Sequence, residues 1–272
     1  MRSRGPSPET STTPLSTAPR LPHEIIEMIV ANLMYDMRSL RACSLTCYSW
    51  YIVAAPRLHH TLVVRAGSYY YQKFRWPEAI FYKHRLGLLP LVRKLRIEKQ
   101  AALWGPVDEV PPKMFSCFTL HKLSGFTNIQ ELAIDYLAIP KFIQKPRRYF
   151  RYFLPTIRSL SLRKPYGSHW QIVSFIGLFR NLEDLNLIFW HEGTRELKDV
   201  PAPAPPFVPP LRGRLTMVFS SAQLPEAMIN VFGGVRFRSM ELFDVGGMRL
   251  LLDACADTLE TVRFYRSDPH GE

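Results

Sequence analysis

Residues 21–54, LPHEIIEMIVANLMYDMRSLRACSLTCYSWYIVA, alternate short apolar stripes with polar breaks. Pro22 suits the first turn of a helix, where the N–H that it lacks has no partner, and Glu24 in the same turn is favoured by the helix dipole. Apolar residues then recur at helical spacing, at Ile25, Ile26, Ile29 and Leu33. This spacing predicts an amphipathic helix with one apolar face.

A second apolar stripe follows the polar break at residues 35–39, where Ser39 is a candidate helix cap. Its members are Leu40, Cys43, Cys47, Trp50 or Tyr51, and Ala54. Pro56 is expected to end the helical region. Two or three short helices bury little apolar surface by themselves, so we expect them to pack on one another and on something else.

The order of residue types in this stretch resembles the F-box, a small helical module that ties a substrate receptor to a ubiquitin ligase. The residues that carry the resemblance are Leu21, Pro22, Glu24, Ile25, Ile26, Ile29, Leu33, Leu40, Leu45, Cys47 and Trp50. Thr46 stands where the family often has Val, which weakens one apolar contact but keeps the pattern. An ordinary helical hairpin at the edge of a larger core is the alternative that periodicity alone would favour.

The resemblance implies partners for this segment. F-box proteins bind the Skp adaptor subunit and, through it, the cullin scaffold of an SCF-type ubiquitin ligase, while another part of the chain holds a protein substrate. The residues that the resemblance implies for the adaptor contact are Leu21, Pro22, Ile25, Ile26, Ile29, Leu45 and Trp50. The match covers 34 of 272 residues, so it leaves the substrate unidentified.

A second pattern recurs through the rest of the chain: an apolar residue, two spacers, Leu or a similar residue, one spacer and another apolar residue. Its central positions are Leu95, Leu132, Leu160, Leu185, Leu215, Met240 and Val262, which lie 22–37 residues apart. Leucine-rich repeats contribute one strand in roughly 20–29 residues, so most of these gaps fit that architecture. Helices are expected between the strands, at residues 171–179, 224–232 and 248–256.

Together the two patterns predict an α/β chain, with a small N-terminal helical F-box followed by an irregular leucine-rich-repeat solenoid with a parallel sheet. The expected parts are a disordered tail at 1–20, an F-box helical domain at 21–60 and a leucine-rich-repeat-like domain at 61–272 with a Pro-rich loop at 201–210. Residues 65–90 and 98–127 are candidates for inserts outside the repeats. A series of unrelated strands in a mixed α/β domain is the alternative.

Strand alternation predicts which side chains of the sheet face solvent on its concave side. The residue after each central position is expected to point outward, and the candidates for substrate binding are Arg96, Ala133, Ser161, Asn186 and Thr216. Such positions are most often only solvated, which is the alternative for this row.

The net charge of +12 is unevenly distributed, because residues 1–180 carry 26 basic and 10 acidic side chains and residues 181–272 carry 9 and 13. Basic and aromatic residues interleave most densely in KFIQKPRRYFRYF, at 141–153, a composition found in single-strand binders. No recognised nucleic-acid motif accompanies this segment, so a solvated loop is favoured. A nucleic-acid-associated protein remains an alternative function, as does a repeat scaffold without a ligase role.

The sequence offers no catalytic motif: it has no Gly-rich phosphate loop, no Gly-x-Ser-x-Gly elbow and no His-Glu-x-x-His helix. Cys43, Cys47, Cys117 and Cys255 are predicted to be core thiols, because a structural zinc site needs four ligands. We therefore expect no enzyme activity, no metal and no cofactor. No apolar run is long enough for a membrane span and no apolar signal region is found, so a cytoplasmic or nuclear location is expected.

Overall fold

The computed structural model describes residues 21–66, 87–99, 126–135, 153–165, 167–189 and 210–265. The chain divides into two compact units, Met1–Leu58 and His59–Glu272, which we call the helical unit and the sheet unit. The predicted tail at 1–20, Cys117, most of the basic segment 141–153 and most of the Pro-rich loop 201–210 lie outside the described residues. In the part of the chain that is described, no helix is long and apolar enough to cross a membrane.

Three helices form the described part of the helical unit: α1 (His23–Asn32), α2 (Met37–Thr46) and α3 (Tyr48–Leu58). As predicted, α1 begins directly after Pro22. The cap of α2 is Asp36, not Ser39, because the Asp36 carboxylate accepts hydrogen bonds from the backbone N–H groups of Arg38 and Ser39 at 3.0 and 3.1 Å. The Ser39 hydroxyl adds to this cap by donating to Asp36 at 2.6 Å.

The Asp36 cap predicts that the helical unit loses stability in acid. The hydrogen bond from the Ser39 hydroxyl and those from the backbone hold the pKa of Asp36 below its ordinary value of 3.8. A carboxyl group whose pKa is lower in the folded state stabilises the fold above its unfolded pKa, and this contribution is lost as the pH falls through the folded pKa. The melting temperature, measured from about pH 5 to pH 2, should therefore fall less steeply with decreasing pH in Asp36→Asn than in wild type. Parallel curves for the two chains would contradict this role of Asp36.

Cys47 and Pro56 depart from the prediction. Cys47 has extended backbone angles (φ −161°, ψ 174°), so it separates two helices where the apolar stripe suggested continuity, and its side chain is exposed instead of buried. Pro56 lies inside α3, which runs on to Leu58. A proline removes one helical hydrogen bond, but its fixed φ is compatible with a helix. The helix therefore continues past Pro56 for its last two residues.

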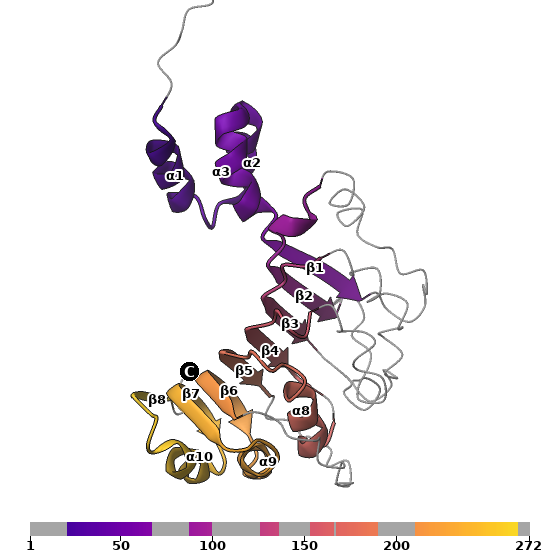
Figure 1. Cartoon of the computed structure of the whole chain (residues 1–272), viewed down its shortest axis with the longest axis vertical. Helices are drawn as coiled ribbons and strands as arrows, with labels where there is room; N and C mark the ends of the chain where they lie inside the picture. Colours follow the sequence, from indigo (N-terminus) through magenta and orange to yellow (C-terminus); the bar gives the residue numbers. More distant parts are fainter. Residues whose placement is uncertain are drawn as a thin grey trace, which may run out of the picture. The chain divides into compact units, whose positions relative to one another are not determined.

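The described strands of the sheet unit form one eight-stranded sheet in which every neighbouring pair is parallel and the strands follow chain order (Figure 1). They are β1 (Thr61–Ala66), β2 (Lys94–Lys99), β3 (Glu131–Asp135), β4 (Ser159–Arg163), β5 (Asp184–Ile188), β6 (Leu211–Ser220), β7 (Val235–Val245) and β8 (Thr261–Tyr265). A 3₁₀ turn, η1 (Leu89–Leu91), precedes β2.

All seven central positions of the sequence pattern fall into one register across this sheet. Leu62 of β1 begins the row, which continues through Leu95, Leu132, Leu160, Leu185, Leu215, Met240 and Val262. A second apolar row lies two residues further along the strands, and its members from β2 to β7 are buried: Ile97, Ile134, Leu162, Leu187, Met217 and Leu242. From β2 to β7, both rows belong to one continuous cluster of buried residues.

The turns before the strands repeat one hydrogen-bonding arrangement. The backbone N–H groups of two successive residues donate to a single carbonyl of the preceding repeat, as Gln130 and Glu131 do to Arg93, at 2.7 and 2.9 Å. Side chains repeat as well, since the amide of Asn181 donates to the carbonyl of Pro155 at 2.8 Å, and Asn128 makes the same bond to Pro90 at 2.9 Å. These shared bonds hold the strand starts in line.

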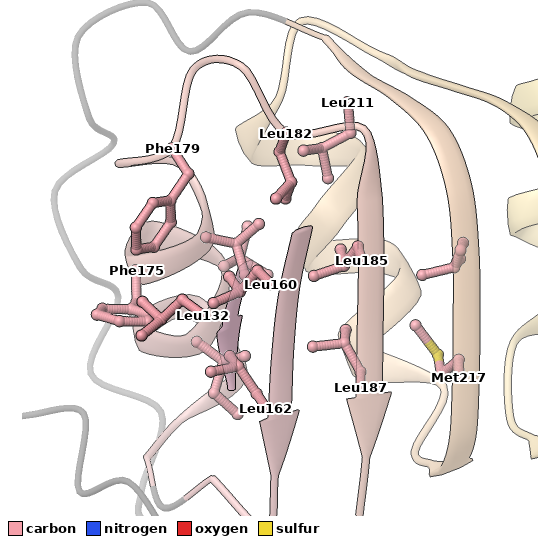
Figure 2. Packing of buried hydrophobic residues seen from close by; sticks show 14 of the residues in the cluster. Leu132, Leu160, Leu162, Phe175, Phe179, Leu182, Leu185, Leu187, Leu211 and Met217 are labelled. Atoms are coloured by element: carbon pink, nitrogen blue, oxygen red, sulfur yellow. The ribbon is translucent and has the colours of Figure 1, made fainter. Parts of the chain in front are cut away.

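Helices cover the core face of the sheet in its second half. They are α8 (His169–Ile176), α9 (Gln223–Val231) and α10 (Met248–Cys255), close to the three predicted helical segments (Figure 1). Phe175 and Phe179 contact each other edge to face at 5.4 Å between ring centres and join the same cluster as the leucines of β3, β4 and β5 (Figure 2). The chain is therefore an N-terminal helical unit followed by a parallel sheet with helices, which is consistent with the α/β class.

Candidate functional site

The helical unit has a very small core and a large exposed apolar surface. Its fully buried cluster consists of Ile26, Val30, Leu40 and Ala54. Its exposed large apolar side chains are Leu21, Ile25, Met28, Ile29, Met34, Tyr35, Met37, Leu45, Tyr48, Tyr51 and Ile52. Soluble proteins seldom leave so much apolar surface in contact with water, so this surface is a candidate for binding another protein.

The first helix separates its core side from its exposed apolar side. Ile26 and Val30 point into the core, whereas Ile25 and Ile29 lie four residues apart on one exposed side of the helix, and the exposed Leu21 precedes the helix. We call Leu21, Ile25, Met28 and Ile29 the α1 stripe. The other exposed side of α1 carries the charged side chains of Glu24 and Glu27 and the small side chain of Ala31. Of these two sides of α1, the α1 stripe has the apolar character of a protein interface.

The second and third helices contribute further exposed apolar side chains. Leu45, near the end of α2, is 86% exposed although it is a leucine, and Tyr48 follows at the start of α3. Tyr51 and Ile52 lie one helical turn beyond Tyr48, at three- and four-residue spacing, so they share its side of α3. Leu45 and Tyr48 flank the exposed Cys47, where the chain is extended between the two helices.

Five of the seven residues that the resemblance implied for the adaptor contact are exposed: Leu21, Pro22, Ile25, Ile29 and Leu45. The other two are less exposed than the resemblance implied. Ile26 is only 3% exposed and belongs to the core, because successive helical residues are rotated by about 100° and Ile25 takes the outer position. Trp50 is half-buried and packs against the same core, so most of its contacts are with the helical unit itself.

Seven exposed apolar side chains of this surface are not among the contacts implied by the resemblance: Met28, Met34, Tyr35, Met37, Tyr48, Tyr51 and Ile52. Met28 was detectable, because it lies three residues after Ile25 on the α1 stripe. The exposed residues of α3 were not detectable from the sequence, because the position of α3 depends on the helix break at Cys47.

The outward row of the sheet is the second candidate surface. Arg96, Ala133, Ser161, Asn186 and Thr216 are direct register partners on neighbouring strands, and each is partly exposed. The row continues through Glu241 and Arg263 on β7 and β8. The structure thus brings all five predicted substrate-binding candidates into one line on the face opposite the core.

Ion pairs order part of this face. The Arg96 side chain contacts Glu98 at 2.7 Å and Asp135 at 3.7 Å. Lys94 and Glu131 form a pair at 2.7 Å, and Arg263 and Glu241 form one at 3.5 Å. Partly exposed pairs of this kind contribute little to stability, so their main effect is to fix where charge is presented.

A hollow of about 470 Å³ lies on the same face, over the starts of β3, β4 and β5 and beside Arg214 and Thr216 within β6. Its polar lining includes Glu131, Ser159, Asp184, Asn186, Arg214 and Thr216. The Oδ1 atom of Asn186 is buried and has no hydrogen-bond partner among the described residues. The hollow therefore holds polar groups that the protein itself does not satisfy.

One Ser–His pair outside these surfaces has the spacing of a catalytic dyad. The Nε2 atom of His169, at the start of α8, lies 2.9 Å from Oγ of Ser221. The Nδ1 atom of His169 is buried and finds no acceptor within the described segments, so no carboxylate orients the ring there. This pair ties the start of α8 to the segment before α9 and offers no complete triad.

Comparison with known families adds one finding, since residues 18–65 match the family model described as F-box-like. The match spans α1, α2, α3 and the first strand. A search of curated proteins found no match to this chain. F-box domains generally bind the Skp adaptor within SCF complexes, and F-box proteins are typically non-catalytic adaptors, so the match supports this general role for the segment that carries the exposed apolar surface.

Proposed function

We propose that this chain is a substrate-recognition subunit of a cullin-based (SCF) ubiquitin ligase. The helical unit binds the Skp adaptor, and the sheet unit binds a protein substrate. The observation that carries the proposal is the exposed apolar surface of α1, α2 and α3, which lies within the segment that matches the F-box-like model.

The adaptor contact uses the α1 stripe together with Leu45. These side chains are exposed in the chain alone, so a partner can bury them without unfolding any part of the helical unit. Apolar side chains at the centre of an interface usually dominate its binding energy. Ile26 and Trp50 hold the helices in place beneath this surface.

The sheet unit is proposed to be an irregular leucine-rich-repeat solenoid. Support comes from the common register of the central Leu positions and from the spacing of 22–37 residues between them. The outward row from Arg96 to Thr216 then lines the substrate surface. In this arrangement the domains run from 21 to 60 and from 61 to 272.

The mechanism is proximity and needs no catalytic residue in this chain. Holding a substrate beside a charged ubiquitin-conjugating enzyme raises the effective concentration of its lysine near the thioester. The chain contributes two binding surfaces and the connection between them.

The test is capture of the purified Skp adaptor by the full chain and by a Leu21→Ala/Pro22→Ala variant. We expect wild type to capture the adaptor and the variant to lose most of it, because both changed residues are exposed and lie at the start of α1. Failure of both chains to capture the adaptor would overturn the proposed function and leave a repeat scaffold without a ligase role.

A further inference from the structure

The outward face of the sheet carries a row of apolar side chains that do not belong to the buried core. The row crosses β5 to β8 three residues after their central positions, and its neighbouring members are direct register partners: Ile188, Val218, Phe243 and Tyr265 (Figure 1). We call these four residues the outward apolar row. Alternation places them on the face opposite the core, and each is at least partly exposed. Four neighbouring strands therefore present apolar side chains to solvent along one line.

The outward apolar row is a local feature of these four strands. At the same position, β2 and β3 carry the acidic residues Glu98 and Asp135, and β4 carries Arg163. The two outward rows that precede it on β5 to β8 are polar, with Asp184, Asn186, Arg214, Thr216, Ser239, Glu241, Thr261 and Arg263. Solvation alone does not favour an apolar line on an otherwise polar face, so the row has the character of a contact surface.

Two aromatic rings form one end of the row. Phe243 and Tyr265 stack with their ring centres 4.2 Å apart and their planes 6° from parallel. Tyr265 is 42% exposed, so the stacked pair is accessible from solvent. A pair of rings whose orientation is already fixed offers a partner a broad apolar contact at a small cost in conformational entropy.

A cation available to a partner lies at the other end of the row. Arg163 is exposed and is the register neighbour of Ile188. On its other side it neighbours Asp135, whose carboxylate contacts Arg96 at 3.7 Å. Arg163 itself forms no ion pair with a described residue. A carboxylate of a partner that lies along the row can therefore accept hydrogen bonds from the Arg163 guanidinium.

The length of the row fits an extended protein segment. Neighbouring strands lie about 4.8 Å apart, so the distance from Ile188 to Tyr265 is about 14 Å, and Arg163 lies about 5 Å further on. Side chains on one face of an extended chain recur about every 7 Å, so three of them at alternate positions also span about 14 Å. The next side chain on that face then reaches Arg163.

We propose that the outward apolar row binds an extended segment of the protein substrate, which carries three apolar side chains at alternate positions and, two residues beyond them, an acidic side chain that pairs with Arg163. The inference rests on the proposed function, since it assigns a chemistry to the substrate that the sheet unit holds. Burial of the apolar side chains supplies most of the affinity. The charge of Arg163 determines which end of the segment lies over β4.

The experiment uses the full chain, immobilised, and fluorescent peptide libraries. Each library has either leucine or serine at three alternate positions and either glutamate or glutamine two residues beyond them, and a second set has the reverse order. We expect wild type to retain the leucine libraries about tenfold more than the serine libraries. In one of the two orders, glutamate should increase retention about threefold over glutamine. Equal retention of the leucine and serine libraries would overturn the proposal.

Substitutions are needed to locate the binding, because the α1 stripe also attracts apolar peptides. The double variant Ile188→Thr/Val218→Thr keeps both side chains β-branched but makes them polar, and it should lower retention of the leucine libraries about fivefold. The matched double variant Ile188→Val/Val218→Ile keeps the row apolar and should bind as wild type does, which separates loss of apolar contact from loss of fold. Equal retention by wild type and the threonine variant would refute this site.

Two further variants test the charge and the specificity. Arg163→Gln should abolish the preference for glutamate over glutamine and leave the preference for leucine over serine in place. Leu250→Gln removes an apolar side chain of α10 that is 46% exposed and lies outside the row, so retention should stay within about twofold of wild type. A glutamate preference that survives Arg163→Gln would place the acidic group elsewhere and contradict the proposed pairing.

Adaptor capture by the same samples separates this inference from the proposed function. If the chain captures the Skp adaptor but the threonine variant retains the libraries as wild type does, the chemistry assigned to the row is wrong and the proposed function stands. If the expected preferences are found but the adaptor is not captured, the row is a peptide site on a protein with another role.

Discussion

An Ile25→Asp substitution is expected to weaken binding of the Skp adaptor about 100-fold while leaving the fold of the chain intact. Ile25 is 40% exposed and lies in the middle of the α1 stripe, so the free chain loses little when it is replaced. In a complex with the adaptor the new carboxylate would be buried against an apolar partner without a counter-charge, which is strongly unfavourable. Isothermal titration with the purified adaptor measures the loss.

The control for this substitution is Ala31→Asp on the same helix. Ala31 is exposed but lies on the side of α1 that carries Glu24 and Glu27, so the same charge is introduced away from the stripe. We expect its adaptor affinity to stay within about threefold of wild type, as surface changes outside an interface usually do. Circular dichroism should show equal helix content in both variants. Equal loss of affinity in the two would show that the α1 stripe is not the adaptor contact.

Gly213→Ala is expected to destabilise the sheet unit by about 4 kcal/mol, an effect of the size that only a severe local conflict produces. A Cβ atom on Gly213 would overlap the carbonyl oxygen of Glu183, which is backbone and cannot rotate away. Gly213 also has φ of +93°, a conformation that side chains strain, and the register of β6 with β7 shifts beside it. The Glu183 carbonyl accepts a hydrogen bond from the N–H of Arg214 at 2.7 Å, so alanine would push β6 away from β5.

The matched control is Gly234→Ala. Gly234 has an even larger positive φ, +114°, but no atom lies within 4 Å of the position that its Cβ would occupy. Alanine there should cost only the backbone strain, about 1–2 kcal/mol. Urea unfolding of both variants isolates the effect of the overlap with Glu183. If both lose the same stability, the overlap is relieved by a small shift and the close approach of β6 to β5 at Gly213 is not essential.

The strands were predictable because the core needs the same residue types at the same spacing in every repeat. Seven of the eight described strands carry an apolar residue three positions before the central one, as Ile129 is before Leu132, or a degenerate copy of that pattern. The first strand was missed, although Leu62 joins the same row. His59 stands three positions before Leu62, but Arg212 stands three positions before Leu215 in a strand that was predicted, so a polar residue at this position does not by itself explain the miss.

The exposed apolar residues of the helical unit were harder to predict than its helices. Periodicity correctly gives α1, but Ile25 and Ile26 are both apolar, and only the packing of α3 against α1 decides which of them is buried. The burial of Trp50 was equally hard to predict, because a large aromatic residue can pack in the core or contact a partner. For the sheet, alternation placed the row from Arg96 to Thr216 correctly, whereas the hollow depends on which charges pair, and this requires side-chain positions.

The order of the strands in the sheet has a consequence for how such a chain can change during evolution. Among the described residues, each strand pairs only with the strands that precede and follow it in the sequence, so none of these strands depends on a distant one for its place. Duplicating or deleting one repeat would lengthen or shorten the sheet without rearranging the others. Segments between strands can also gain residues at small entropic cost, since doubling a flexible loop costs only about 0.6 kcal/mol. Selection can therefore remodel the outward face of the sheet one strand at a time while the N-terminal helices remain unchanged.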